Sequence, residues 1–280
     1  MAAESLIVAL GEQRYRVIRP WGRPPANTGF DLPSQLGVDA TGCVYVFQRS
    51  GVPVIVLDPE GNYLRSWGVG VMADPHGIYV SPSGTVFCID RDAHQVIAFD
   101  LEGREKFRIG ERHAPRHGAP FNHPTDIAEA PDGELFVSDG YGNSNIHRFG
   151  PDGTWRMSWG TPGAEPGQFS TPHGVWVLSD GRVLAADREN NRIQVFTADG
   201  RLLDVWSDFY HPMDVFADAQ DRVYVSDQIP RLTRLSPGGA LTGRCRPVLN
   251  GGHGLCGDAA GNLFLAEMIP PRVTKLELIA

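Results

Sequence analysis

A short motif that recurs six times is the feature that most constrains the fold of this chain. Its clearest copies are Pro75-His-Gly-Ile78 and Pro172-His-Gly-Val175. In every copy the second position is followed 14 residues later by a polar residue that closes an apolar run. The pairs are Ser34 and Gln48, His76 and Asp90, Thr125 and Asp139, His173 and Asp187, Met213 and Asp227, and His253 and Glu267. A constant offset in six copies indicates an internal repeat.

Each repeat predicts four short β-strands separated by tight turns. In the second repeat the expected strands are 76–80, 85–90, 95–99 and 106–109, with turns at Ser83-Gly84 and Glu102-Gly103. Four strands in a period of 40 to 49 residues are typical of a β-propeller blade. We therefore expect an all-β, six-bladed β-propeller whose blades begin near residues 33, 75, 124, 172, 212 and 252.

The last repeat has room for only three strands before the chain ends, and the missing strand is predicted at the other end. The segment 14–22, which ends in Trp21-Gly22, is similar to the outer strands that end in Trp67-Gly68 and Trp159-Gly160. An N-terminal strand that completes the last blade closes the ring and leaves no open edge inside it. We therefore expect residues 1–280 to form a single propeller domain.

Composition narrows the classes of partner. The net charge is −8, from 25 basic and 33 acidic residues, and there is no basic cluster, which argues against nucleic acid. No apolar run approaches the roughly 20 residues of a membrane span. The N-terminal apolar segment lacks the preceding basic residue of a secretory signal, and the four cysteines lack metal-site spacing. These features predict a cytoplasmic protein with free thiols, and they leave its oligomeric state open.

The second position of the motif predicts a metal site. First strands line the central channel of a propeller, so the six equivalent residues form a ring around the axis. Histidines occupy alternate places in this ring: His76, His173 and His253. Three imidazoles with an open fourth position are the pattern of catalytic zinc. The alternative is that His-Gly is only a favourable strand entry. Between the histidines, we expect Thr125 and Met213 to contact a substrate.

A second ring follows one residue after each closing polar position. It consists of Arg49, Arg91, Gly140, Arg188, Gln228 and Met268. Arg49 and Arg188 are candidates for binding an anionic substrate group, in competition with a structural role, whereas Arg91 is expected to be structural. Blade three instead places Tyr141 between Gly140 and Gly142, whose backbone freedom would let the phenol be aimed. Tyr141 is thus a candidate general base, or else a residue packed under a loop.

These residues resemble the NHL-repeat propellers and, within them, the peptidyl-α-hydroxyglycine α-amidating lyases. The matching strings are Val46-Phe-Gln-Arg49, Pro75-His-Gly-Ile78, His123-Pro-Thr-Asp-Ile127, Val137-Ser-Asp-Gly-Tyr-Gly-Asn-Ser144, Pro172-His-Gly174 and Ala186-Asp-Arg-Glu-Asn-Asn-Arg-Ile193. The resemblance implies that His76, His173 and His253 ligate zinc, that Tyr141 is the catalytic base, and that Arg49 and Arg188 contact the substrate or the tyrosinate. The family's acidic ligand for a structural calcium is replaced here by Gly254, which makes calcium doubtful.

Three functional hypotheses follow. The first is a zinc-dependent lyase that splits the C–N bond of an α-hydroxyglycine-like carbinolamide into an amide and glyoxylate or an aldehyde. Its substrate would be a small or peptide-like molecule with a carboxylate. The second is a metal-dependent hydrolase of an amide, hydrazide or lactone. The third is a non-enzymatic NHL scaffold that binds a protein partner.

Overall fold

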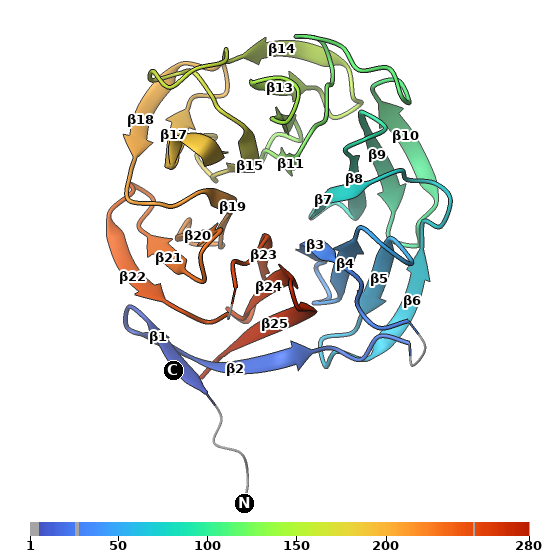
Figure 1. Ribbon diagram of the computed structural model, residues 1–280, viewed down its shortest axis with the longest axis vertical. Coiled ribbons are helices and arrows are strands. Elements are labelled where there is room, and N and C mark those ends of the chain that lie inside the picture. The colour runs from blue at the N-terminus through green and yellow to red at the C-terminus, as the bar shows by residue number, and fades with distance from the viewer. Residues whose placement is uncertain (1–5, 26–27, 249, 280) are drawn as a thin grey trace, which may run out of the picture.

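The protein is a closed ring of six β-sheets around a central channel (Figure 1). The computed structural model describes residues 6–25, 28–248 and 250–279. Five sheets have four strands each in sequence order, from the axis to the rim. The sixth joins the two ends of the chain in the order β1-β2-β25-β24-β23. The six-bladed propeller and its closure by an N-terminal strand are therefore confirmed.

The strands are short, as the turn spacing predicts. The innermost strands are β3 (Pro33–Val38), β7 (Pro75–Val80), β11 (Asp126–Glu129), β15 (Pro172–Val177), β19 (Pro212–Ala217) and β23 (Gly254–Gly257). The second strands are β4 (Val44–Gln48), β8 (Thr85–Asp90), β12 (Leu135–Asp139), β16 (Val183–Asp187), β20 (Val223–Asp227) and β24 (Leu263–Met268). The third strands are β5 (Val54–Leu57), β9 (Gln95–Asp100), β13 (Asn145–Phe149), β17 (Arg192–Phe196), β21 (Leu232–Leu235) and β25 (Pro271–Leu278).

The outer strands are largely exposed or half-buried and complete the blades. They are β6 (Tyr63–Trp67), β10 (Glu105–Ile109), β14 (Trp155–Trp159), β18 (Leu202–Trp206), β22 (Leu241–Cys245) and β2 (Gln13–Trp21). A further strand, β1 (Ile7–Leu10), pairs with β2 and gives the last blade a fifth strand that the repeat does not predict. The one helix among the described residues is a 3-10 turn, η1 (Arg188–Asn190), and no helix there could cross a membrane.

The core lies between blades rather than inside one central mass. Each of the six hydrophobic clusters joins two neighbouring blades. The cluster around Leu36 and Phe264 joins the last blade to the first, and it includes Trp21 of β2. Because every blade buries both faces against its neighbours, the circle is stabilised only when it is complete.

Tryptophans at the ends of outer strands lock one blade to the next. A Cβ atom on Gly103 would lie 2.6 Å from the indole of Trp67, and one on Gly200 would lie 2.8 Å from Trp159. Both glycines also have positive φ, near 80°, in the turn before the next blade's outer strand. The repeated Trp-Gly ending of the sequence is thus an interblade joint.

Candidate metal centre

A β-bulge at the start of the innermost strand turns the second motif residue toward the axis. In β15 the ladder shifts register between Pro172 and Gly174, so His173 is an extra residue. The ladder of β7 shifts in the same way around His76. A bulge bends a strand and redirects a side chain. His253 directly precedes β23 and enters the channel from the loop before it.

In blades one to four, the polar residue that follows the axis residue by 14 positions anchors the loop before the motif. Asp90 accepts hydrogen bonds from the backbone N–H groups of Ala73 and Asp74, both at 2.9 Å. Asp187 accepts one from the N–H group of Ser170 at 2.8 Å. Both carboxylates are fully buried. The offset of 14 residues is therefore explained by hydrogen bonds from the polar residue to the loop that leads into the axis residue.

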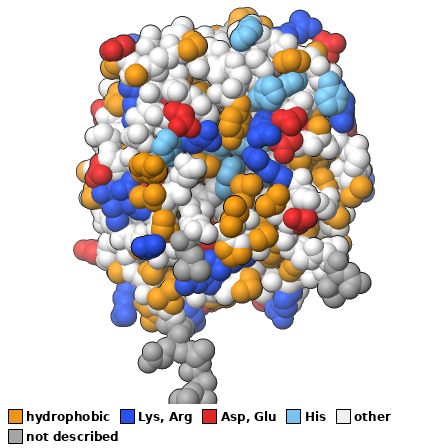
Figure 2. All heavy atoms as spheres, in the orientation of Figure 1, with side chains coloured by type: hydrophobic (Ala, Val, Ile, Leu, Met, Phe, Trp, Pro, Cys, Tyr) orange, Lys and Arg blue, Asp and Glu red, His pale blue; other side chains and the backbone are white. Residues whose placement is uncertain are grey.

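Three histidine side chains from alternate blades meet on the axis. One ring nitrogen from each of His76, His173 and His253 lies within 4.8 Å of those of the other two. Their ring centroids are 4.9 to 5.2 Å apart. Figure 2 shows histidine side chains in a hollow near the centre of this face. The sequence prediction that these three residues converge is thus realised in the fold.

Each imidazole is oriented by the axis residue of the next blade. Its Nδ1 atom lies 2.7 to 2.8 Å from a backbone carbonyl oxygen, in the pairs His76 with Thr125, His173 with Met213, and His253 with Ser34. A carbonyl oxygen can only accept, so each Nδ1 carries the hydrogen and donates it. Each Nε2 then keeps a lone pair, which is the form in which imidazole binds a metal.

Burial keeps the three histidines neutral. It lowers the pKa of His253 to about 3, with a further contribution from the charge of Arg49. The pKa values of His76 and His173 also lie well below the usual value, mainly because of burial and then because of the neighbouring histidines. Three neutral, oriented imidazoles fit a divalent transition metal, and imidazole suits Zn, Cu, Fe and Ni. The residues present can therefore hold a metal.

The Tyr141 hydroxyl lies against this histidine cluster. Its oxygen is 3.2 Å from Nε2 of His76 and 3.1 Å from Nε2 of His173. Arg188 donates a hydrogen bond from Nη1 to the same oxygen at 3.2 Å. The guanidinium carbons of Arg91 and Arg188 each lie 5.2 Å from the centroid of the phenol ring.

Gly140 and Gly142 position Tyr141 because they have no Cβ atom, and not because of a special backbone conformation. Neither glycine has a positive φ, so the conformational reason expected from the sequence is wrong. A Cβ atom on Gly140 would overlap the carbonyl oxygen of Pro172, and one on Gly142 would overlap the side chain of Asn122. Only glycine lets this loop approach the neighbouring backbone and bring the phenol over the axis.

Three arginines from one ring position surround the histidines. Arg188 begins η1 and pairs with Glu189 at 2.8 Å. Arg91 pairs with Asp74 at 2.7 Å, and Nε of Arg49 is 4.0 Å from the same carboxyl group. Nε and Nη2 of Arg49 are buried without a hydrogen-bond partner among the described residues. Arg49 thus has donors available to an anion.

Thr125 and Met213, the two expected substrate contacts between the histidines, differ in position. Thr125 is fully buried, and its hydroxyl bonds to Ser138 and to the carbonyl oxygen of Pro172 at 2.9 Å. Thr125 also lines a small cavity together with the three histidines, and its contact with a substrate stays a prediction. Met213 lines a cavity of about 340 Å³ that also reaches His253.

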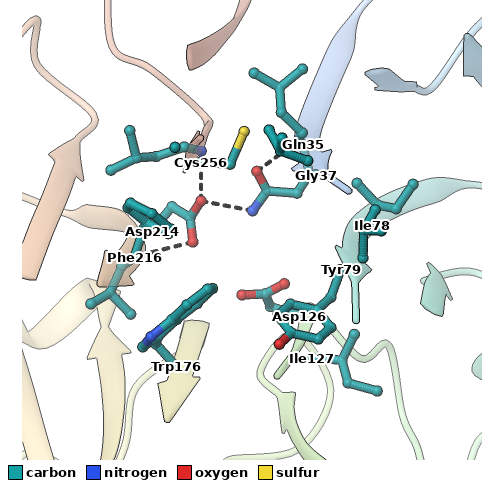
Figure 3. Close-up of a pocket in the computed structure, with 16 residues that line it drawn as sticks. Gln35, Gly37, Ile78, Tyr79, Asp126, Ile127, Trp176, Asp214, Phe216 and Cys256 are labelled. Carbon is teal, nitrogen blue, oxygen red and sulfur yellow. Dashed lines mark hydrogen bonds between the residues drawn. The ribbon is translucent and has the colours of Figure 1, made fainter. Parts of the chain in front are cut away.

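A second polar layer lies next along the channel (Figure 3). The Asp214 carboxylate accepts hydrogen bonds from the Gln35 side chain at 2.7 Å and from the N–H group of Leu255 at 2.6 Å. Asp126 accepts one from the N–H group of Val175 at 3.1 Å. Burial raises the pKa of Asp214 to about 7 and raises that of Asp126, which the Asp214 charge raises further.

This layer explains why glycine follows each histidine. A Cβ atom on Gly174 would lie 3.0 Å from Cα of Asp214, and one on Gly77 would lie 2.6 Å from the carbonyl oxygen of Thr125. At Gly254 a Cβ atom would overlap Oε1 of Gln35. The place of the acid that would hold a structural calcium is therefore filled by Gln35, so the residues present do not reproduce that ligand.

Comparisons with known proteins agree with the fold and with the sequence motifs. The NHL repeat model matches residues 169–196. Peptidyl-glycine alpha-amidating monooxygenase B of Xenopus laevis is 36% identical over 170 residues, which are 55% of this chain and 19% of that protein. The probable peptidyl-alpha-hydroxyglycine alpha-amidating lyase of Caenorhabditis elegans is 32% identical over 150 residues, 52% of this chain and 43% of that protein.

This chain is a six-bladed propeller that matches the NHL repeat model in one segment and is similar to the amidating proteins over about half of its length. The recognition made from the motifs is thereby confirmed. The match spans less than half the length of either relative. Among solved structures, an inactive variant of virginiamycin B lyase from Staphylococcus aureus with quinupristin superposes with a TM-score of 0.68. It covers 94% of this chain and 88% of that one at 18% identity, a likeness of fold alone.

Sequence reasoning missed two parts of the site. The contact of Arg91 with the Tyr141 ring was not expected, because Asp90-Arg91 reads as a structural pair. The layer of Gln35, Asp126 and Asp214 was also missed. The sequence does contain its signal. In the three repeats whose axis residue is not histidine, that residue is followed by a polar residue rather than by glycine.

Proposed function

We propose that this protein is a metal-dependent lyase that cleaves the C–N bond of an α-hydroxyglycine-like carbinolamide. The products are an amide and glyoxylate, or an aldehyde where the substrate lacks the carboxylate. The observation that carries the proposal is the position of the Tyr141 hydroxyl, 3.1 to 3.2 Å from two of the three histidines and from Arg188. Relatives whose names include alpha-amidating lyase support it.

The histidines supply the metal site in this proposal. His76, His173 and His253 would hold a divalent ion, with zinc first among the candidates. Such an ion, when bound, supplies Lewis acidity that lowers the pKa of a substrate hydroxyl. The backbone carbonyl groups of the intervening blades keep the imidazoles in the required tautomer.

Tyr141 acts as the general base. Its phenolate takes the proton of the substrate hydroxyl, the C–O bond becomes a carbonyl, and the C–N bond breaks. The electron pair of that bond stays on nitrogen, which receives the proton that Tyr141 took from the hydroxyl, so the amide and the carbonyl product account for every atom without water. Arg188 donates to the phenolate oxygen and stabilises its charge.

Arg49 is the residue best placed to hold the substrate carboxylate. Its buried Nε and Nη2 atoms lack hydrogen-bond partners among the described residues, and Nε is 4.0 Å from the Asp74 carboxyl group, whereas Arg91 pairs with that group at 2.7 Å. A guanidinium binds a carboxylate with two parallel hydrogen bonds. The substrate would then be a small or peptide-like molecule whose carboxylate lies beside the metal site.

The deciding experiment combines metal analysis with product analysis. We expect purified protein to contain about one divalent transition metal per chain and to convert α-hydroxyhippurate to benzamide and glyoxylate. Chelation should abolish turnover and zinc should restore it. The label from heavy-oxygen water should be absent from the amide product.

Two other outcomes identify the alternatives. Activity on a plain amide, hydrazide or lactone, with incorporation of oxygen from water, would make the protein a hydrolase. Protein without metal after dialysis, and inert toward every carbinolamide, would support a non-enzymatic scaffold.

A further inference from the structure

The ring of residues that contains the three arginines is cationic on one side of the metal centre and uncharged on the other. Blades one, two and four place Arg49, Arg91 and Arg188 in this position. Blades five and six place Gln228 and Met268 there. The position is structurally the same, one residue after the buried polar end of a second strand. Blade three has Gly140 at this place, so the ring has a cationic half, in blades one to four, and an uncharged half, in blades five and six.

The uncharged half borders an open pocket beside His253. This cavity of about 340 Å³ is lined by Met213, Gln228, Met268 and Ile269, together with Asn250, Gly251, Gly252 and His253. Among the described residues that line it there is no Lys, Arg, Asp or Glu. Gly251 brings the backbone close, because a Cβ atom there would overlap the carbonyl oxygen of Gln228.

The cavity is adjacent to the reacting centre. His253 belongs both to the cavity lining and to the three-histidine cluster, and the carbonyl oxygen of Met213 accepts the hydrogen bond from Nδ1 of His173. Tyr141, Arg91 and Arg188 lie on the opposite side, where they contact one another. Figure 2 shows both cationic and hydrophobic side chains around the central hollow.

We infer that the Met213, Gln228, Met268 and Ile269 cavity binds the acyl group on the amide side of the substrate, and that this group is uncharged and apolar. This inference rests on the proposed function. When the cationic half holds the substrate carboxylate, the acyl group on the nitrogen of the C–N bond that breaks extends across the histidines into the cavity. Its thioether and aliphatic walls suit an aromatic or branched acyl group. A cavity of about 150 Å³ already accommodates benzene.

Charged acyl groups are disfavoured by the same lining. A carboxylate or ammonium buried against Met213 and Met268 loses its hydration, and the described lining residues offer no opposite charge. Gln228 and Asn250 provide only neutral amides. The protein therefore selects N-acyl-α-hydroxyglycines whose acyl part is neutral.

The test compares three substrates that share the reacting centre: N-benzoyl-, N-acetyl- and N-succinyl-α-hydroxyglycine. We expect kcat/KM for the benzoyl compound to exceed that for the acetyl compound by roughly 10- to 100-fold, because a phenyl group is buried. The succinyl compound should be the poorest substrate. Benzamide should bind the zinc-loaded protein in calorimetry, and succinamate should not.

Substitutions at Met268 test whether the preference for the benzoyl compound arises in this cavity. Met268→Glu should lower the ratio of kcat/KM for the benzoyl and acetyl compounds by roughly 10-fold or more and weaken benzamide binding. Met268→Leu should keep both at the wild-type level. Ile229→Glu is the matched control, because Ile229 neighbours Gln228 but lines a different pocket. It adds the same charge and should leave the preference unchanged.

Failure of the inference is distinct from failure of the proposed function. Equal kcat/KM for all three substrates, or an unchanged preference in Met268→Glu, would overturn the inference while the lyase stands. If none of the carbinolamides is cleaved, the lyase proposal fails. Binding of benzamide no tighter than that of succinamate would then overturn the cavity assignment independently.

Discussion

The Tyr141 hydroxyl is the single group on which the proposed proton transfer depends. Tyr141→Phe keeps the ring between Arg91 and Arg188 but removes the oxygen that faces the histidines. We expect turnover of α-hydroxyhippurate to fall by roughly 10²- to 10⁴-fold, the usual effect of losing a general base. The loss should appear in kcat with little change in KM, measured by glyoxylate release.

Metal content separates this effect from a structural one. The Phe variant should keep its metal, since Tyr141 is not one of the three histidines. Full activity in that variant would remove Tyr141 from the mechanism.

The three histidines should be individually required for metal binding. We expect His76→Ala, His173→Ala and His253→Ala each to lose most bound metal after dialysis, because two imidazoles rarely retain a divalent ion. Mass spectrometry of the metal content measures this directly. His117→Ala, at an exposed histidine in the loop before blade three, is the control. Stoichiometric metal in all three variants would show that the ion binds elsewhere or that the cluster is only structural.

At the scale of elements, the loop after β12 depends on close backbone contact. Gly140→Ala places a Cβ atom against the carbonyl group of Pro172 at the start of β15. Because backbone cannot yield as a side chain does, we expect a loss of roughly 1–3 kcal/mol in the free energy of unfolding. Displacement of Tyr141 should also reduce kcat.

Gly238→Ala is a suitable comparison for this change. The nearest atom to a Cβ there is Oγ of Ser236 at 3.9 Å, and Gly238 does not have a positive φ. Equal stability of the two variants in denaturant unfolding would contradict the steric account of Gly140.

The polar layer beneath the histidines gives a pH dependence of known sign. The pKa of Asp214 is raised to about 7 in the folded protein, above its unfolded value. The folded state therefore binds the proton more tightly, and this contribution to stability is present at low pH and is lost as the pH rises through about 7.

Asp214→Asn should remove this dependence. From about pH 5 to about pH 8, the free energy of unfolding of the wild type relative to the variant should decrease, by on the order of 1–3 kcal/mol. Urea unfolding at several pH values measures it. A difference that stays constant or increases with pH would show that the carboxyl group is charged in the folded protein throughout.

At the scale of the whole molecule, stability depends on closure. β2 supplies Tyr15 and Val17 to the cluster between blades five and six, and Trp21 to the cluster between blades six and one. Deletion of residues 1–22 removes both contributions and the ladder with β25. We expect the free energy of unfolding to fall by several kcal/mol, roughly the margin of a whole domain.

Deletion of residues 1–11 is the matched control for that experiment. It removes β1, the fifth strand at the rim, but keeps β2 and the closed ring. We expect a much smaller shift of the melting temperature than for the longer deletion. Similar melting of the longer deletion and the full chain would contradict closure as the source of stability.

The sequence alone determined the repeat, the number of blades, the closing strand and the convergence of His76, His173 and His253. These follow from periodicity, because a fixed offset in every repeat becomes a fixed place around an axis. The candidate roles of Tyr141, Arg49 and Arg188 came from the family resemblance and from the loop after each second strand.

Only the tertiary structure decided which side chains each of these residues meets. Periodicity cannot show that Thr125 is saturated by Ser138 and Pro172, or that Arg91 faces the phenol. The reasons for Gly140 and Gly174 are likewise contacts with the next blade. Such contacts join residues of neighbouring repeats, and their geometry is set by how closed blades pack, which no single repeat encodes.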